Sequence, residues 1–66
     1  MVHVAVDKNG SEGVYDERPV RDNDNGEWVP IMYGREFSDW VELPKGSIEK
    51  LIGRKLTWED DAVKLT

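Results

Sequence analysis

One stretch of this chain indicates a short helix with both ends marked: Leu43-Pro44-Lys45-Gly46-Ser47-Ile48-Glu49-Lys50-Leu51-Ile52-Gly53. Ile48, Leu51 and Ile52 are spaced i, i+3 and i+4, which places them on one face of a helix. The Ser47 hydroxyl is predicted to accept a hydrogen bond from a free N–H in the first turn. Gly53 suits the left-handed conformation that ends many helices. We therefore predict a helix over residues 47–52 with one apolar face.

The segments before this helix have the pattern of strands. Valines at positions 2, 4 and 6 alternate with His3 and Ala5, which predicts a strand with one buried face and with His3 on an exposed or edge face. Residues 7–10 contain Asn-Gly and predict a hairpin turn. Residues 13–15 begin a return strand, and Pro19 keeps it short or at an edge because proline donates no ladder hydrogen bond.

The middle and the tail predict further strands and turns. Residues 21–26 read as a polar loop, and residues 28–33 as a strand interrupted at Pro30 or as a partly extended connection. The alternation of residues 37–43 predicts one strand, in which Asp39 is an inward charge or marks a bulge. Residues 56–58 suggest a last strand. For the tail we favour an extended chain over a single helical turn capped by Thr57, because the segment is too short to sustain a helix.

Together these elements predict one domain, residues 1–66, of the α+β class. We expect a small, mainly antiparallel β-sheet of three to five strands with one short helix packed on it. The predicted core consists of apolar side chains from the first strand, the strand at 37–43 and the helix region. These are Val4, Val6, Val41, Leu43, Ile48, Leu51, Ile52 and Leu56.

Charge is distributed unevenly along the chain. The formal net charge is −5, with ten acids and four bases between residues 7 and 42, but one acid and four bases between residues 43 and 58. The helix region is therefore a basic island in an acidic protein. An acidic surface repels the nucleic acid backbone, so we predict no direct nucleic-acid binding.

The chain lacks the residues that several kinds of catalytic and metal-binding site require. The chain contains no cysteine and a single histidine, and it has no phosphate-loop or dinucleotide-binding glycine motif. Residues 21–26 offer the glycine of a calcium loop, but Arg21 and Met32 stand where that loop needs carboxylates. We therefore predict no catalytic residues, no cofactor and no metal site. No apolar run is long enough to span a membrane, and the N-terminus lacks signal-peptide features, so we expect a cytoplasmic protein.

Two functional hypotheses remain, and both concern binding. In the first, an acidic surface bearing tryptophan covers a protein partner, and a homodimer is possible. Its residues are Trp28, Trp40, Asp22, Asp24 and Glu27. In the second, the basic island binds a small anionic ligand such as a nucleotide at the free N–H groups of the helix. Its residues are Lys45, Ser47, Lys50, Arg54 and Lys55.

The run from Leu43 to Asp60, LPKGSIEKLIGRKLTWED, resembles the C-terminal half of short, uncharacterised proteins encoded in phage and prophage regions of gut bacteria. This resemblance covers about the last third of the chain. It implies a phage accessory protein that blocks a host factor. The first hypothesis then becomes an inhibitor that imitates the charge of nucleic acid and competes for a basic groove on a host enzyme.

Overall fold

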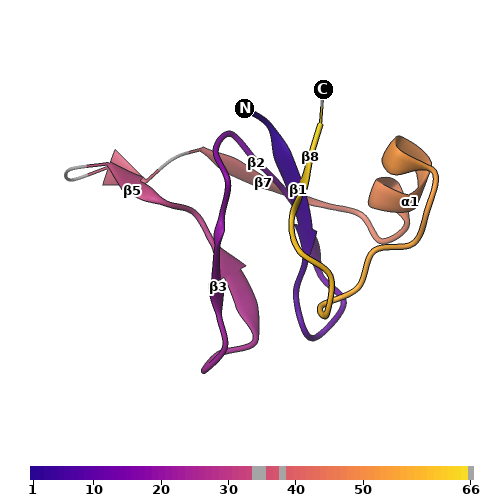
Figure 1. Cartoon of the computed structure of the whole chain (residues 1–66), viewed down its shortest axis with the longest axis horizontal. Helices are drawn as coiled ribbons and strands as arrows, with labels where there is room; N and C mark the ends of the chain where they lie inside the picture. The colour runs from indigo at the N-terminus through magenta and orange to yellow at the C-terminus, as the bar shows by residue number, and fades with distance from the viewer. Residues whose placement is uncertain (34–35, 38, 66) are drawn as a thin grey trace.

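The computed structural model describes residues 1–33, 36–37 and 39–65, and it is built around a four-stranded antiparallel sheet (Figure 1). The strand order is β7-β2-β1-β8, with β1 at His3–Val6, β2 at Glu12–Tyr15, β7 at Trp40–Leu43 and β8 at Val63–Lys64. Two hairpins accompany this sheet: β3 (Val20–Asp22) with β4 (Glu27–Val29), and β5 (Met32–Tyr33) with β6 (Glu36–Phe37). The helix α1 spans Ser47–Ile52. The predicted α+β fold is confirmed.

The strand β1 is buried on both faces because it lies between β2 and β8 and is covered from either side. Alternate side chains point to opposite faces of a strand, so Val4 and Val6 share one face while His3 and Ala5 share the other. The His3 side chain is 8% exposed, and its Nδ1 lies 2.9 Å from the Met1 carbonyl oxygen. The prediction of a single buried face with His3 exposed is therefore wrong, because a second layer covers the other face.

These two layers lie on opposite sides of the sheet, with α1 on one side and the β3–β4 hairpin on the other (Figure 1). On the helix side, Ile48 and Leu56 pack with the valines of β1. On the other side, Ala5 packs with Tyr15, Trp28 and Ala62. A sheet covered on both faces gives this short chain two small cores in place of one.

Six of the eight predicted core side chains pack in the helix-side cluster, and two do not. Leu43 and Ile52 are partly buried against that cluster, whereas Val41 is 61% exposed and Leu51 is 58% exposed. In the helix, Ile48 is buried and Ile52 is partly buried against this cluster, whereas Leu51 remains exposed. Val41 lies on the edge strand β7. The prediction of these two residues as core is wrong.

The start of α1 is capped by a side chain from a distant strand. The Glu12 carboxylate on β2 accepts hydrogen bonds from the backbone N–H groups of Gly46, over 2.7 Å, and Ile48, over 2.8 Å. The hydroxyl of Ser47, the predicted cap, donates instead to the Pro44 carbonyl. The prediction for the other end is confirmed: Gly53 has φ 77° and donates to the Glu49 carbonyl over 2.9 Å.

Four predictions about connections and strand length are confirmed. The hairpin turn at residues 7–10 closes with a hydrogen bond from the Gly10 N–H to the Asp7 carbonyl over 2.9 Å. Pro30 separates β4 from β5, and the tail is extended and forms β8. The return strand β2 is short, as expected, although it lies inside the sheet.

Three predictions about strands are wrong. The loop expected at residues 21–26 begins two residues later, because Val20–Asp22 form β3. The strand expected over residues 37–43 is divided between β6 and β7, which belong to different sheets. Asp39 lies between them, where its carbonyl accepts a hydrogen bond from the Asp16 N–H. Residues 56–58 form no strand, because Thr57 closes a turn with Asp60.

Candidate functional site

The side chain of Trp28 is part of the core on the hairpin side of the sheet. It is 6% exposed, and its indole N–H donates to the Val6 carbonyl over 3.0 Å. Its backbone N–H donates to the Asp7 carboxylate over 2.8 Å, and its carbonyl accepts from the Tyr15 hydroxyl over 3.3 Å. The prediction that Trp28 belongs to an exposed contact surface is wrong, because this side chain joins the β3–β4 hairpin to the main sheet.

Arg21 joins the same hairpin to the C-terminal tail. Its guanidinium carbon lies 4.6 Å from the ring centre of Trp28 and 4.5 Å from that of Trp58. It also donates to the Asp60 carbonyl over 2.9 Å. A hollow of about 400 Å³ lies beside it. Because Arg21 is already bonded within the protein, we interpret this region as a structural junction.

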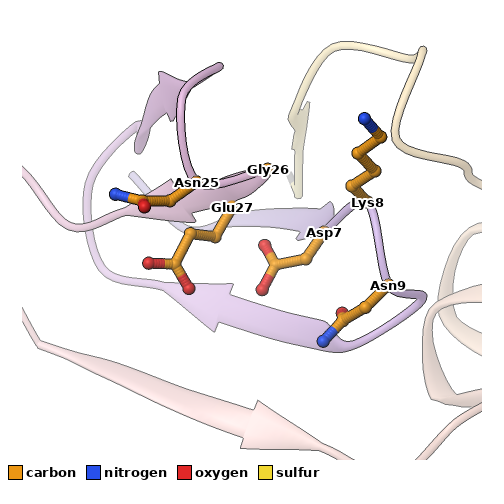
Figure 2. A pocket seen from close by; sticks show the side chains of 6 residues that line it. All are labelled: Asp7, Lys8, Asn9, Asn25, Gly26 and Glu27. Atoms are coloured by element: carbon orange, nitrogen blue, oxygen red, sulfur yellow. The ribbon is translucent and has the colours of Figure 1, made fainter.

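A second hollow, of about 240 Å³, lies where the β1–β2 turn meets the start of β4 (Figure 2). The Asp7 carboxylate points toward the side of the hollow where Glu27 lies, whereas the Lys8 amino group points away from both carboxylates (Figure 2). Burial raises the pKa of Asp7, the hydrogen bond from the Trp28 N–H opposes this rise, and the charge of Glu42 adds to it. Among the described residues, no group of three or more His, Cys, Asp or Glu could hold a metal ion. This hollow is therefore an acidic junction between two hairpins.

The acids predicted at residues 22 and 24 lie at the end of β3 and in the turn that follows it. The Asp22 carboxylate accepts from the Asn25 side chain over 2.8 Å and from the backbone N–H of Asn25 and Asp24. These bonds, that of the Asn25 side chain first, lower the pKa of Asp22. The turn of the β3–β4 hairpin lies far from the start of β7 (Figure 1). Asp22 and Asp24 thus belong to a hairpin that is not part of the sheet containing Trp40.

The basic island does not offer the helix amides that the anion-binding hypothesis needs. Two of the amides at the start of α1 already donate to the internal carboxylate of Glu12. The hydroxyl of Ser47 donates to the Pro44 carbonyl. The charged side chains of this hypothesis lie in exposed positions, at Lys45, Lys50, Arg54 and Lys55. The N–H groups of Gly46 and Ile48 are therefore not free to bind an anion, and the four exposed cations are left without that part of the predicted site.

The surface that exposes a tryptophan lies at β7. Trp40 is 47% exposed, and its ring stacks on Tyr15 with ring centres 5.7 Å apart and an interplanar angle of 13°. Its neighbour Val41 is exposed on the helix side of the sheet. Because Tyr15 is buried beneath Trp40, desolvation raises the pKa of Tyr15 to about 12, and the charges of Asp7 and Glu27 contribute to this rise. The exposed ring thus has a rigid support.

Exposed carboxylates border this apolar surface. A hollow of about 220 Å³ beside β7 is lined by Val2, Val14, Asp16 and Asp39 as well as by Trp40, Val41 and Tyr15. Glu42 follows on the same strand and is exposed. We name the β7 edge surface by its exposed members: Val2, Asp16, Asp39, Trp40, Val41 and Glu42.

Sequence reasoning finds one member of this surface, Trp40, and misses the others. The alternation along its strand predicts Val41 as a core residue, although the structure exposes it. Glu27, which the first hypothesis groups with Trp40, lies in the acidic junction of Figure 2 instead. The missing information is the position of β7 in the sheet, since a side chain on an edge strand has fewer neighbours than the same side chain on a central strand.

Comparison with known proteins adds no relative to this picture. The chain matches no protein-family model, no curated protein and no solved structure. No helix in the described part of the chain has the length and apolar composition to cross a membrane. We therefore infer function from this chain's own residues and surface.

Proposed function

We propose that this chain is a non-enzymatic protein-binding module, and that the β7 edge surface covers a basic site on the partner protein. The main supporting observation is that Trp40 and Val41 are adjacent and exposed, with carboxylates around them. Exposed aromatic side chains on a rigid support are typical anchors of protein interfaces. The surrounding carboxylates favour a partner of opposite charge and speed its approach.

The resemblance of residues 43–60 to phage accessory proteins narrows this proposal. We propose that the partner is a host nucleic-acid-binding factor, and that this chain acts in the cytoplasm as its inhibitor. A basic groove that binds phosphates also attracts an acidic protein. Asp16, Asp39 and Glu42 would contact the cations of such a groove, while Trp40 would contribute most of the apolar contact.

The test is capture of a partner from a bacterial extract by the immobilised chain at low salt, followed by measurement of affinity with the purified partner. The Trp40→Ala variant should weaken binding by about tenfold or more, since truncating an anchor residue costs about 2 kcal/mol or more. Raised salt should weaken binding further. The matched control is Val20→Ala, because Val20 is an exposed apolar side chain of another hairpin.

Two results would contradict this function. One is the absence of any partner at low salt whose binding depends on Trp40. The other is equal loss of binding in Trp40→Ala and Val20→Ala, which would place the contact surface elsewhere.

A further inference from the structure

The strand β7 lies at one end of the main sheet, and none of the described strands pairs with its outer edge. On its inner side, the Asp16 N–H donates to the Asp39 carbonyl over 2.9 Å, and Tyr15 lies opposite Trp40. Hydrogen-bonded and non-hydrogen-bonded pairs alternate along an antiparallel ladder. The backbone groups of Val41 therefore face β2, and those of Trp40 and Glu42 face outward.

Both faces of this edge end in an apolar side chain. Trp40 lies opposite Tyr15 and stacks on its ring, on the face away from α1. Val41 lies opposite Val14 on the other face. A strand that paired with β7 would form backbone hydrogen bonds and would also place side chains beside Trp40 on one face and beside Val41 on the other.

The charges at this edge select the kind of strand that would pair with it. Asp39 and Glu42 flank the two apolar positions, and Asp16 adds a third exposed carboxylate nearby. A second copy of this chain would bring the same carboxylates and a net charge of −5. Repulsion therefore disfavours self-pairing, and a basic strand has the complementary charge.

We propose that the partner contributes an extended basic segment that pairs antiparallel with the outer edge of β7; this inference rests on the protein-binding function proposed above. The register defines its sequence. A basic residue lies opposite Glu42, a β-branched residue opposite Val41, an apolar or threonine residue opposite Trp40, and a second basic residue opposite Asp39. The contact motif, in chain order, is basic, β-branched, apolar or threonine, basic.

The probe is a short capped peptide containing lysine, valine, threonine and lysine in that order, titrated into the labelled protein by NMR. Backbone N-methylation tests the register. The first lysine and the threonine, opposite Glu42 and Trp40, direct their N–H groups at β7, whereas the valine directs its N–H away. N-methylation of the threonine should weaken binding by about tenfold or more, because it removes a hydrogen bond and inserts a methyl group. N-methylation of the valine should change affinity by less than about threefold, because every bond to β7 is kept.

A pair of variants tests the same edge from the protein side. Glu42→Gln removes the charge and keeps the outward N–H, whereas Glu42→Pro removes the N–H as well. Proline is tolerated on the outer side of an edge strand, and circular dichroism checks that both variants fold. Glu42→Pro should bind the peptide at least about fivefold more weakly than Glu42→Gln.

Three results would overturn strand pairing. They are no binding of the unmodified peptide, equal effects of the two N-methylations, and a stable dimer in sedimentation equilibrium that Glu42→Pro dissociates. If a purified partner binds in a Trp40-dependent manner while the peptide shows any of these results, the strand-pairing inference fails and the protein-binding function stands.

Discussion

Trp28 and Trp40 lie on the same side of the main sheet, yet their surroundings differ completely. Around Trp28, every polar group of the residue is bonded to β1, β2 or the turn between them, and an arginine covers the indole ring. Around Trp40, one face of the ring rests on Tyr15 and nearly half of the side chain is exposed. The first region closes the fold, and the second is left open at a sheet edge.

This contrast shows how a small chain can use large side chains for two purposes. A domain of this size buries a modest share of its surface, so each fully buried aromatic side chain is important for stability. Trp28 provides such burial and also links the hairpin layer to the sheet. Trp40 adds little to that link, and its exposure at an acidic edge fits the partner recognition proposed above. The following changes test that division.

The largest expected effect comes from removing the Trp28 ring. Trp28→Ala should lower the free energy of unfolding by about 3–5 kcal/mol, because it empties a buried site and removes a hydrogen bond to Val6. Trp40→Ala should lower it by about 1 kcal/mol, since its main consequence is to remove the stacking on Tyr15. Urea unfolding followed by circular dichroism measures both, and Trp28→Phe supplies a value if Trp28→Ala does not fold. Equal losses of unfolding free energy at the two positions would contradict the view that Trp28 stabilises the fold much more than Trp40 does.

Smaller effects are expected at Asp7, where two substitutions distinguish the contribution of its charge from that of its hydrogen bond. Asp7→Ala should lower the free energy of unfolding by about 1–3 kcal/mol, because it leaves the buried Trp28 N–H without an acceptor. Asp7→Asn keeps an acceptor oxygen and removes a charge that burial and Glu42 disfavour. We therefore expect Asp7→Asn to be as stable as the original chain or more stable at pH 7. If Asp7→Asn is as unstable as Asp7→Ala, the carboxylate charge itself holds the junction.

Alkaline pH should weaken the support beneath Trp40. The unfolded chain releases the Tyr15 proton near pH 10, and burial raises the folded-state pKa to about 12. Between these values the unfolded state binds fewer protons, so the free energy of unfolding falls as pH rises. This contribution is complete below about pH 10 and disappears as the pH rises through about 12. Tyr15→Phe should remove this fall from the plot of unfolding free energy against pH. If the plot is the same for Tyr15→Phe and the original chain, Tyr15 ionises freely in the folded protein.

The smallest effect is expected at the open edge. Val41→Thr should change the free energy of unfolding by less than about 0.5 kcal/mol, because the side chain is exposed. The matched change Val4→Thr lies in the same row of paired residues, at a position with no exposure. It should cost about 1–3 kcal/mol, since it buries a hydroxyl. A large cost at Val41 would mean that β7 is covered.

Features that depend on near neighbours can be predicted from the sequence. The helix at Ser47–Ile52, its end at Gly53 and the break at Pro30 are all present in the structure as expected. Each depends on backbone angles or on side chains three or four residues apart. Features that depend on distant partners cannot be predicted in this way. Glu12 caps the start of α1 by accepting a hydrogen bond from Gly46, which is 34 residues further along the chain. No local sequence pattern predicts such a bond.

The sequence by itself determined the α+β class, the short helix at Ser47–Ile52, the acidic net charge and the presence of three tryptophans. The tertiary structure alone decided which tryptophan is buried, that Val41 lies at a sheet edge, and that the helix amides already hold a carboxylate. The physical reason is the range of the forces involved. Turn geometry and helix periodicity act over a few residues, whereas burial is set by whichever distant strand or layer comes to cover a side chain.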